Sequence, residues 1–326
     1  MEQTNKITFS NPDTPLIEIH DDLFTQKRIR VFVKREDLTD NYISGNKWYK
    51  LKYNLIEAKK RGFNTLLTFG GAFSNHIHAT AAAGKRFGFN TIGIIRGEEH
   101  LPLNPTLSFA SGNGMYLEYI NRTAYRNKYD PELIHKFKNK FGDFYLIPEG
   151  GSNSLAVKGC SEIVSSINIK FDFVCSACGT GGTLAGLIFG LNNNAFALGF
   201  SVLKGGEFLN QNIKSFLKSV DAEELNNWQI KLDYHFGGYA KVTDELIMFC
   251  DNFLKKYNIP IEPIYTGKMF YGLFDLIKQD YFPTGSSIVA IHTGGLQGLN
   301  GLEFRGKYNS KKLLNLKSRL NDILLD

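Results

Sequence analysis

Glycine-rich segments that directly follow short apolar runs are the feature of this sequence that most restricts its fold. Three such junctions occur, at residues 65–71, 171–183 and 287–295. In open parallel sheets, ligands bind beyond the carboxyl ends of strands, where loops of this kind converge. We therefore expect the three glycine-rich loops to form one composite ligand site.

The rest of the chain alternates β-branched runs with amphipathic stretches. The candidate strands are Arg30–Lys34, Thr65–Phe69, Thr91–Ile95, Met115–Tyr119, Phe144–Ile147, Phe171–Ser176, Ala197–Val202, Lys231–His235 and Ser287–His292. The candidate helices are Lys50–Arg61, Ile77–Phe87, Ser154–Ile167, Leu184–Leu191 and Asp244–Tyr257. Such alternation favours βαβ units and mostly parallel sheets with helices on both faces. Because 326 residues are too many for one small sheet, we expect an α/β fold of two domains with a cleft between them.

Charge and hydropathy exclude several classes of function. No apolar run approaches the roughly 20 residues that span a bilayer, and residues 1–6 lack the features of a secretory signal. We therefore expect a soluble, cytoplasmic protein. The net charge of +6 is the balance of 38 basic and 32 acidic residues, most of them scattered. The basic stretches at 59–61 and 305–319 are typical of solvated helix faces, so no nucleic-acid or membrane partner is predicted.

The four cysteines predict neither a metal site nor a redox pair. Cys175 and Cys178 have C-x-x-C spacing, but no second such pair and no closely spaced histidine pair completes a zinc set. They also precede a glycine-rich turn, where small residues are needed for steric reasons. We expect no metal ion.

The loop Gly179–Thr183 is a candidate anion site. Its glycines let backbone N–H groups curl around an anion, and the helix that follows adds its positive N-terminal end. The loop lacks the Gly-Lys-Ser/Thr ending of a P-loop and is not a clean G-x-G-x-x-G. Phosphate binding is the favoured interpretation, with packing alone as the alternative.

Lys47 is the candidate reactive residue. It follows Ser44-Gly45-Asn46 and opens a predicted helix, where the helix end and burial both lower the pKa of an ammonium group. An uncharged lysine is a nucleophile toward aldehydes and a base toward Cα–H bonds. The alternative is an ordinary solvated charge.

Ser74-Asn75-His76 stands at another predicted helix start. Simple N-capping by Ser74 or Asn75 is one interpretation. The functional interpretation lets Asn75 bind a cofactor hydroxyl and puts Ser74 beside the reacting atoms. We assign no catalytic role to His76.

Taken together, seven segments resemble the fold-type II pyridoxal-phosphate enzymes, in the group of 1-aminocyclopropane-1-carboxylate deaminase and D-cysteine desulfhydrase. In chain order they are Val33-Lys34-Arg35-Glu36-Asp37-Leu38, Gly45-Asn46-Lys47, Ser74-Asn75-His76, Pro148-Glu149-Gly150-Gly151-Ser152-Asn153, Gly179–Thr183, Pro263-Ile264-Tyr265-Thr266-Gly267-Lys268 and His292-Thr293-Gly294-Gly295. Each segment is weak alone, but their order along nearly the whole chain makes the resemblance specific.

The resemblance implies a tryptophan-synthase-β-like architecture, pyridoxal 5'-phosphate as cofactor, a small amino acid as substrate and a homodimer. It implies a larger cofactor-binding domain of residues 1–46 plus 155–326, and a smaller inserted α/β domain of residues 47–154. The implied catalytic residues are Lys47, Ser74, Tyr239 and Tyr265. The implied cofactor-binding residues are Lys47, Asn75, Cys178, Gly179, Thr180, Gly181, Gly182, Thr183, Thr266 and Thr293.

Departures from the family pattern bear on the substrate. Members that open the cyclopropane ring carry a glutamate at the place of Thr266 and a leucine at the place of Thr293, whereas desulfhydrase-like members carry threonines. The expected glutamine before Ser74 is Phe73, and the expected Thr-Arg after Lys47 is Trp48-Tyr49. Phe73 and Trp48 either narrow the pocket or pack against the second domain.

The favoured function is therefore α,β-elimination from D-cysteine, or a related small amino acid, to pyruvate, sulfide and ammonia. The first alternative is deamination of 1-aminocyclopropane-1-carboxylate. Alternatives of other classes are a catalytically silent protein that binds the cofactor or an amino acid, and a dinucleotide-binding protein that uses the Gly179 loop. The sequence lacks the clean dinucleotide fingerprint, which counts against the last of these.

Overall fold

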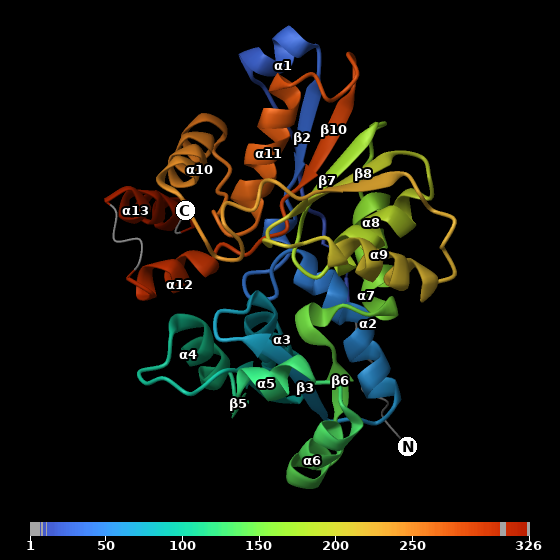
Figure 1. The fold of residues 1–326 in the computed structure, drawn as a ribbon, viewed down its shortest axis with the longest axis vertical. Coiled ribbons are helices and arrows are strands. Elements are labelled where there is room, and N and C mark those ends of the chain that lie inside the picture. Colours follow the sequence, from blue (N-terminus) through green and yellow to red (C-terminus); the bar gives the residue numbers. More distant parts are fainter. Residues whose placement is uncertain (1–6, 8, 11, 307–310, 325–326) are drawn as a thin grey trace.

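The computed structural model describes residues 7, 9–10, 12–306 and 311–324. Their strands form two sheets, which lie one above the other in Figure 1. The larger sheet has the order β1-β2-β10-β7-β8-β9 and the smaller has the order β5-β4-β3-β6. Among the described strands, β1 alone pairs antiparallel, at the edge of the larger sheet. The predicted α/β fold with two mostly parallel sheets is confirmed.

The larger sheet consists of β1 (Leu16–Ile19), β2 (Arg30–Lys34), β7 (Phe173–Cys178), β8 (Phe196–Ser201), β9 (Trp228–Lys231) and β10 (Ser287–Ile291). The helices around it are α1 (Asp22–Lys27), α2 (Asn46–Lys60), α7 (Ser154–Ser165), α8 (Gly182–Leu191), α9 (Phe208–Lys218), α10 (Asp244–Tyr257), α11 (Thr266–Lys278), α12 (Gly298–Phe304) and α13 (Lys311–Leu324).

The smaller sheet consists of β3 (Thr65–Gly71), β4 (Asn90–Arg96), β5 (Met115–Ile120) and β6 (Tyr145–Ile147). Its helices are α3 (Asn75–Phe87), α4 (Pro105–Gly112), α5 (Arg122–Arg126) and α6 (Pro131–Phe141). Helices α3 and α4 contribute to the core on one face, and α5 and α6 contribute to the core on the other.

Each central strand of the larger sheet is buried on both faces. In β10, Ile288 and Ala290 join the core that includes α1, α10 and α11, whereas Val289 and Ile291 join the core that includes α2, α7, α8 and α9. Successive side chains of a strand point to opposite faces, so a continuous apolar run supplies both cores.

Helices α2 and α7 join the two halves of the molecule. One core cluster contains Leu66 of the smaller sheet, Val289 of the larger sheet, and Leu55 and Val157 of the two helices. Lys52 Nζ lies 2.7 Å from Glu162 Oε2 across the helix pair. The two sheets therefore share continuous apolar packing, and the limits at residues 46 and 154 stay predictions.

Two sequence predictions about strands need correction. The strand expected at Lys231–His235 lies instead at Trp228–Lys231, and residues 233–235 form a bend and the start of a turn. The turn continues through Gly237 and Gly238, which have φ of 89° and 115°, conformations that side-chain-bearing residues rarely take. Strand β1 was missed because its run of four residues is short and only partly buried.

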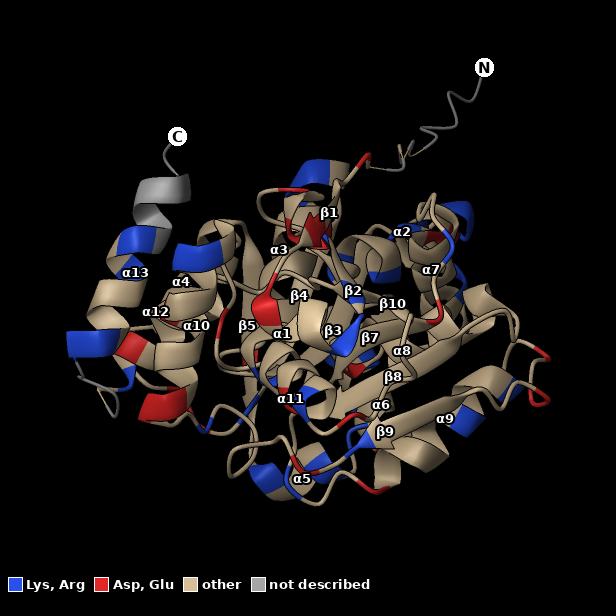
Figure 2. Ribbon diagram, turned by 90° about the horizontal axis from the view of Figure 1, so that it is seen from above, with Lys and Arg blue, Asp and Glu red and all other residues tan. Residues whose placement is uncertain are grey.

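The cysteines, the potential metal ligands and the apolarity of the helices bear on which metals and membranes were expected as partners. All four cysteines are free and buried, and no cluster of three or more potential metal ligands occurs among the described residues. In that part of the chain no helix has the length and apolarity to cross a membrane. Basic and acidic segments are interspersed in the view of Figure 2.

Candidate functional site

A cavity of about 1050 Å³ opens at the carboxyl ends of β3, β7 and β10. It is lined by residues 71–76, 177–181 and 293–295, which follow or end these strands. The three glycine-rich loops thus converge on one cavity, as expected, and its role as a ligand site stays a prediction.

Lys47 lies in this cavity at the start of α2. The loop after β10 packs closely against the start of the helix. The two segments are so close that a Cβ atom on Gly45 would lie 2.0 Å from the Thr293 carbonyl oxygen. Lys47 Nζ donates to Asn46 Oδ1 at 3.1 Å, and Asn46 in turn donates to Thr183 Oγ1 at 2.7 Å. Burial, together with the nearby charge of Lys50, lowers the pKa of Lys47 to about 7. The predicted fall in its pKa is confirmed in direction.

Lys50, one helical turn beyond Lys47, is a functional candidate that the sequence analysis missed. Its ammonium group donates to Ser152 Oγ at 2.9 Å and to the Gly150 carbonyl at 3.1 Å, and it lies 3.4 Å from Thr180 Oγ1. Burial lowers its pKa, and these three described contacts are with carbonyl and hydroxyl oxygens, not carboxylates. Lys50 could have been identified from its spacing of three residues from Lys47, because residues at this spacing lie on the same face of a helix.

The loop before α8 has the structure of an anion cradle. Gly181 has φ of 88°, and no side chain caps the helix, so its first N–H groups are available to an anion. A Cβ atom on Gly182 would lie 2.6 Å from Ser152 Oγ and 3.3 Å from Lys50 Nζ. Glycine at 182 therefore lets the ammonium group of Lys50 approach the loop closely.

Ser74 and Asn75 lie at the start of α3. Ser74 Oγ accepts from the N–H groups of His76 and Ile77 at 3.2 and 3.3 Å, which confirms the N-capping interpretation. Both residues also line the cavity. The Asn75 carboxamide forms no hydrogen bond within the described ranges, and a Cβ atom on Gly295 would lie 2.8 Å from its Nδ2. It therefore has donors and an acceptor left for a ligand.

His76 lines the cavity as a neutral imidazole. Burial and the charges of Lys47 and Lys50 hold its pKa well below the usual value. Its Nε2 lies 2.8 Å from Thr68 Oγ1, which donates its own proton to the Ile147 carbonyl. Nε2 must therefore carry the imidazole proton.

Two tyrosines close the side of the cavity formed by the larger sheet. The rings of Tyr239 and Tyr265 lie 5.8 Å apart at 65°, and burial raises the pKa of both phenols. The buried ammonium of Lys268 donates to the carbonyls of His235 and Gly238 at 2.9 and 2.8 Å, which holds the loop that carries Tyr239.

A buried acid, also missed from the sequence, lies beside Thr266. Glu262 accepts backbone N–H bonds from residues 264–266 and lies 3.2 Å from Thr266 Oγ1. Burial raises its pKa to about 7. Thr266 is itself fully buried and is not among the residues that line the cavity, whereas Thr293 is.

The structure brings together most of the residues that the resemblance assigned. All except Gly182 and Thr266 line the cavity. Of the two residues expected either to narrow the pocket or to pack against the second domain, Phe73 lines the cavity, but Trp48 is buried outside it, where its ring centroid lies 5.2 Å from that of Phe9. Trp48 therefore does not narrow the pocket directly.

These residues fit pyridoxal phosphate. The uncapped start of α8 and Lys50 can hold a phosphate, Lys47 supplies an amine of lowered pKa for an aldehyde, and Asn75 offers an uncommitted carboxamide to a ring hydroxyl.

Comparison with known proteins agrees with this geometry. Residues 7–294 match the family described as pyridoxal-phosphate dependent enzyme. A protein of Pyrococcus horikoshii, named a candidate 1-aminocyclopropane-1-carboxylate deaminase, is 34% identical over 280 residues, which cover 82% of this chain and 85% of the relative. The mitochondrial bifunctional D-cysteine desulfhydrase/1-aminocyclopropane-1-carboxylate deaminase of Arabidopsis thaliana is 31% identical over 294 residues, which cover 82% of this chain and 73% of the relative.

Solved structures show the same architecture. The crystal structure of an ACC deaminase homologue has a TM-score of 0.78 at 30% identity and covers 93% of each chain. A hydrogen sulfide-producing enzyme from Fusobacterium nucleatum, with a TM-score of 0.64 at 17% identity over 88% of this chain and 96% of its own, shares the fold. The chain therefore belongs to the fold-type II pyridoxal-phosphate enzymes, in the family of 1-aminocyclopropane-1-carboxylate deaminases and D-cysteine desulfhydrases, with pyridoxal 5'-phosphate as its cofactor.

Proposed function

We propose that this enzyme catalyses α,β-elimination from a small amino acid, with D-cysteine as the favoured substrate and pyruvate, sulfide and ammonia as products. The observation that carries the proposal is the Lys47 amine, which lies in the cavity with a pKa of about 7. Near neutral pH a large share of such amines is unprotonated and can accept a proton from a substrate.

Lys47 and Ser74 have separate roles in proton removal and substrate orientation. The cofactor, when bound, supplies an electron-withdrawing ring for the electron pair left as the Cα–H bond breaks. Lys47 takes the Cα proton at Nζ. Ser74 orients the α-carboxylate, because its Oγ already accepts from the backbone of α3 and its hydroxyl proton is free to donate.

The tyrosines assist the leaving group. Because the pKa of both Tyr239 and Tyr265 is raised, their hydroxyls keep their protons at neutral pH. One of them donates to the sulfur as the Cβ–S bond breaks and its electron pair moves onto sulfur. The enamine that remains takes up water and gives pyruvate and ammonia.

The choice of cysteine rests on Thr266 and Thr293, where the family resemblance places a glutamate and a leucine in ring-opening members. The cyclopropane amino acid has no Cα hydrogen, so Lys47 would have no Cα proton to remove. One observation favours ring opening as the second candidate: the carboxylate of Glu262 lies beside Thr266, so an acid is present near that position.

Product analysis distinguishes the candidates. The purified enzyme is incubated in parallel with D-cysteine, L-cysteine and 1-aminocyclopropane-1-carboxylate, and sulfide, pyruvate and 2-oxobutanoate are measured. We expect sulfide and pyruvate from D-cysteine at the highest kcat/KM. Higher kcat/KM for 2-oxobutanoate formation would favour the ring-opening activity instead. Cofactor binding without turnover of any of the three would favour a catalytically silent protein.

A further inference from the structure

Two arginines that line the cavity form no ion pair with any acid in the described part of the chain. Arg96 ends β4, Arg305 follows α12, and both line the cavity. Within the described residues, the arginines that pair with carboxylates are Arg30, Arg35, Arg86 and Arg319. Unpaired guanidinium groups beside a ligand cavity are available for an acidic ligand.

Aromatic rings hold both guanidinium groups without using their N–H donors. Arg305 Cζ lies 4.1 Å from the ring centroid of Phe73, and Arg96 Cζ lies 5.7 Å from that of Tyr125. Phe73 is in turn pressed against α12, since a Cβ atom on Gly301 would lie 2.6 Å from its ring. Phe73, which replaces the glutamine expected in the family, thus serves as a platform for Arg305.

The two guanidinium groups act on the same part of the cavity. The charges of Arg305 and Arg96 both lower the pKa of Tyr239, against the larger raising effect of burial. Tyr239 is one of the two tyrosines that we place beside the leaving group. Arg96, Arg305 and Tyr239 also line the same cavity, so both positive charges face the space that holds the substrate.

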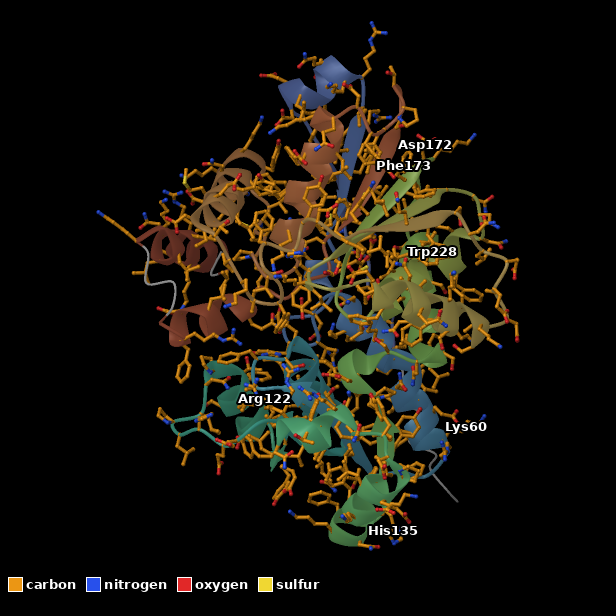
Figure 3. The ribbon with its side chains drawn as sticks, viewed as in Figure 1. Lys60, Arg122, His135, Asp172, Phe173 and Trp228 are labelled. Atoms are coloured by element: carbon orange, nitrogen blue, oxygen red, sulfur yellow. The ribbon has the colours of Figure 1, made fainter. Side chains whose placement is uncertain are left out.

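The charges that line the cavity do not balance. The cavity is lined by the basic residues Lys47, Lys50, Arg96, Arg122 and Arg305 and by two acids, Glu98 and Glu149. Lys47, with a pKa of about 7, is not a full positive charge at neutral pH, but the other four basic residues still outnumber the two acids. Glu149 is already engaged by Tyr125 at 2.7 Å and Lys128 at 3.1 Å. Lys47 and Lys50 are assigned to the cofactor. The rim retains three arginines, among them Arg122 on α5, labelled in Figure 3.

We propose that Arg96 and Arg305 form a subsite for a second acidic group, so that amino acids whose side chain carries its own acid bind in preference to neutral ones of similar length. The inference rests on the proposed function for placing the α-carboxylate at Ser74. A guanidinium group matches the paired oxygens of an acid, which a neutral side chain cannot offer.

Calorimetric titration of the holoenzyme tests the subsite without any chemistry. The probes are 3-sulfopropanoate, which carries an acid at each end and no amine, and butanoate, which carries one acid. We expect the wild type to bind 3-sulfopropanoate about tenfold or more tightly. Arg96→Gln and Arg305→Gln should each reduce this preference, and the double variant should abolish it with butanoate affinity unchanged.

The matched control is Arg126→Gln, which removes the same charge from an exposed position on α5 outside the cavity. It should keep the full preference. Equal binding of the two probes by the wild type, an undiminished preference in the double variant, or an equal loss in Arg126→Gln would each overturn the subsite. Because neither probe reacts, a lack of D-cysteine turnover would contradict the proposed function alone.

Discussion

The carboxylate of Glu262 lies 3.2 Å from the hydroxyl of Thr266, and both side chains are fully buried at the start of α11. Backbone N–H groups from three consecutive residues converge on the same carboxylate. Glu262 thus binds the N-terminal turn of α11 in the way a cap does, and it fixes the position of Tyr265, which lines the cavity.

This relationship predicts a pH dependence of stability. The pKa of Glu262 is raised from 4.5 to about 7 in the folded protein, so between these values the folded state holds a proton that the unfolded state has lost. The contribution of Glu262 to the free energy of unfolding is therefore greatest below pH 4.5 and falls, by on the order of 3 kcal/mol, as the pH rises to about 7.

The measurement compares urea unfolding of the wild type and Glu262→Gln across this pH range. Glutamine has no such titration, so the stability advantage of the wild type should shrink as the pH rises and then stay level. Parallel stability curves for the two proteins would show that Glu262 does not titrate in this range.

The site residues that could be predicted from the sequence are those whose role depends on neighbours close to them in the chain. Gly179–Thr183 and Ser74-Asn75 stand next to strand ends, so their convergence followed from the rule for parallel sheets. Lys50 and Glu262 escaped prediction because their importance depends on burial by distant segments. The ammonium of Lys50 lies at a loop 130 residues away in sequence, beside Thr180, and helix spacing alone does not show which face is buried.

The same limit applies to the fold. Buried strands such as β2 and β10 were recognised because their apolar runs are continuous. The edge strands β1 and β9 were missed or misplaced, since an edge strand is stabilised by pairing with one neighbour and requires less apolar sequence. Phe73 shows a further case, because only the folded structure reveals that Arg305 stacks on it.

Lys47→Ala should remove the absorbance of lysine-bound cofactor and lower turnover by about 10²–10⁴-fold or more, while thermal unfolding stays close to wild type. The reason is that the variant removes the amine that lies in the cavity with a pKa of about 7. Lys60→Ala, at the exposed end of α2, is the control. A borohydride-reduced peptide map that placed the cofactor on another lysine would refute the assignment.

Lys50→Met should weaken cofactor binding while leaving covalent attachment at Lys47 possible. Loss of one charged hydrogen bond to a phosphate costs about 1.5–3 kcal/mol, or about 10–150-fold in Kd. Equilibrium dialysis against pyridoxal phosphate measures the change, with Lys60→Met as the control.

Gly181→Asp, which adds a negative charge to the loop that contacts Lys50, at a backbone φ of 88°, should weaken cofactor binding more than Lys50→Met does. Unaltered affinity in both variants would mean that the phosphate binds elsewhere.

Lys268→Met should impair catalysis without touching the cofactor. The variant leaves the carbonyls of His235 and Gly238 without their donor, so the loop that carries Tyr239 loses its anchor. Misplacement of a catalytic group by about 1 Å can cost about 10²-fold in rate. We expect kcat to fall and the cofactor absorbance to stay unchanged, whereas Lys241→Met, exposed on the same loop, should behave as wild type. A full rate in Lys268→Met would show that the loop holds Tyr239 without this lysine.

The last prediction concerns the two threonines that distinguish this chain from ring-opening members of its family. Thr266→Glu combined with Thr293→Leu should raise the ratio of kcat/KM for 1-aminocyclopropane-1-carboxylate to kcat/KM for D-cysteine by about tenfold or more. The new carboxylate would lie beside Glu262, and two buried carboxylates at this distance share one proton near neutral pH. The site would then hold a proton donor that a threonine cannot supply.

Thr266→Gln combined with Thr293→Leu is the matched control, because glutamine has the shape of glutamate without its acid. It should leave the ratio close to that of the wild type. Phe73 remains in both variants and, as part of the cavity wall, limits how far the switch can go. Equal ratios in the glutamate and glutamine variants would show that the acid does not select the reaction. A wild type that already prefers the cyclopropane substrate would show that Thr266 and Thr293 do not determine the chemistry.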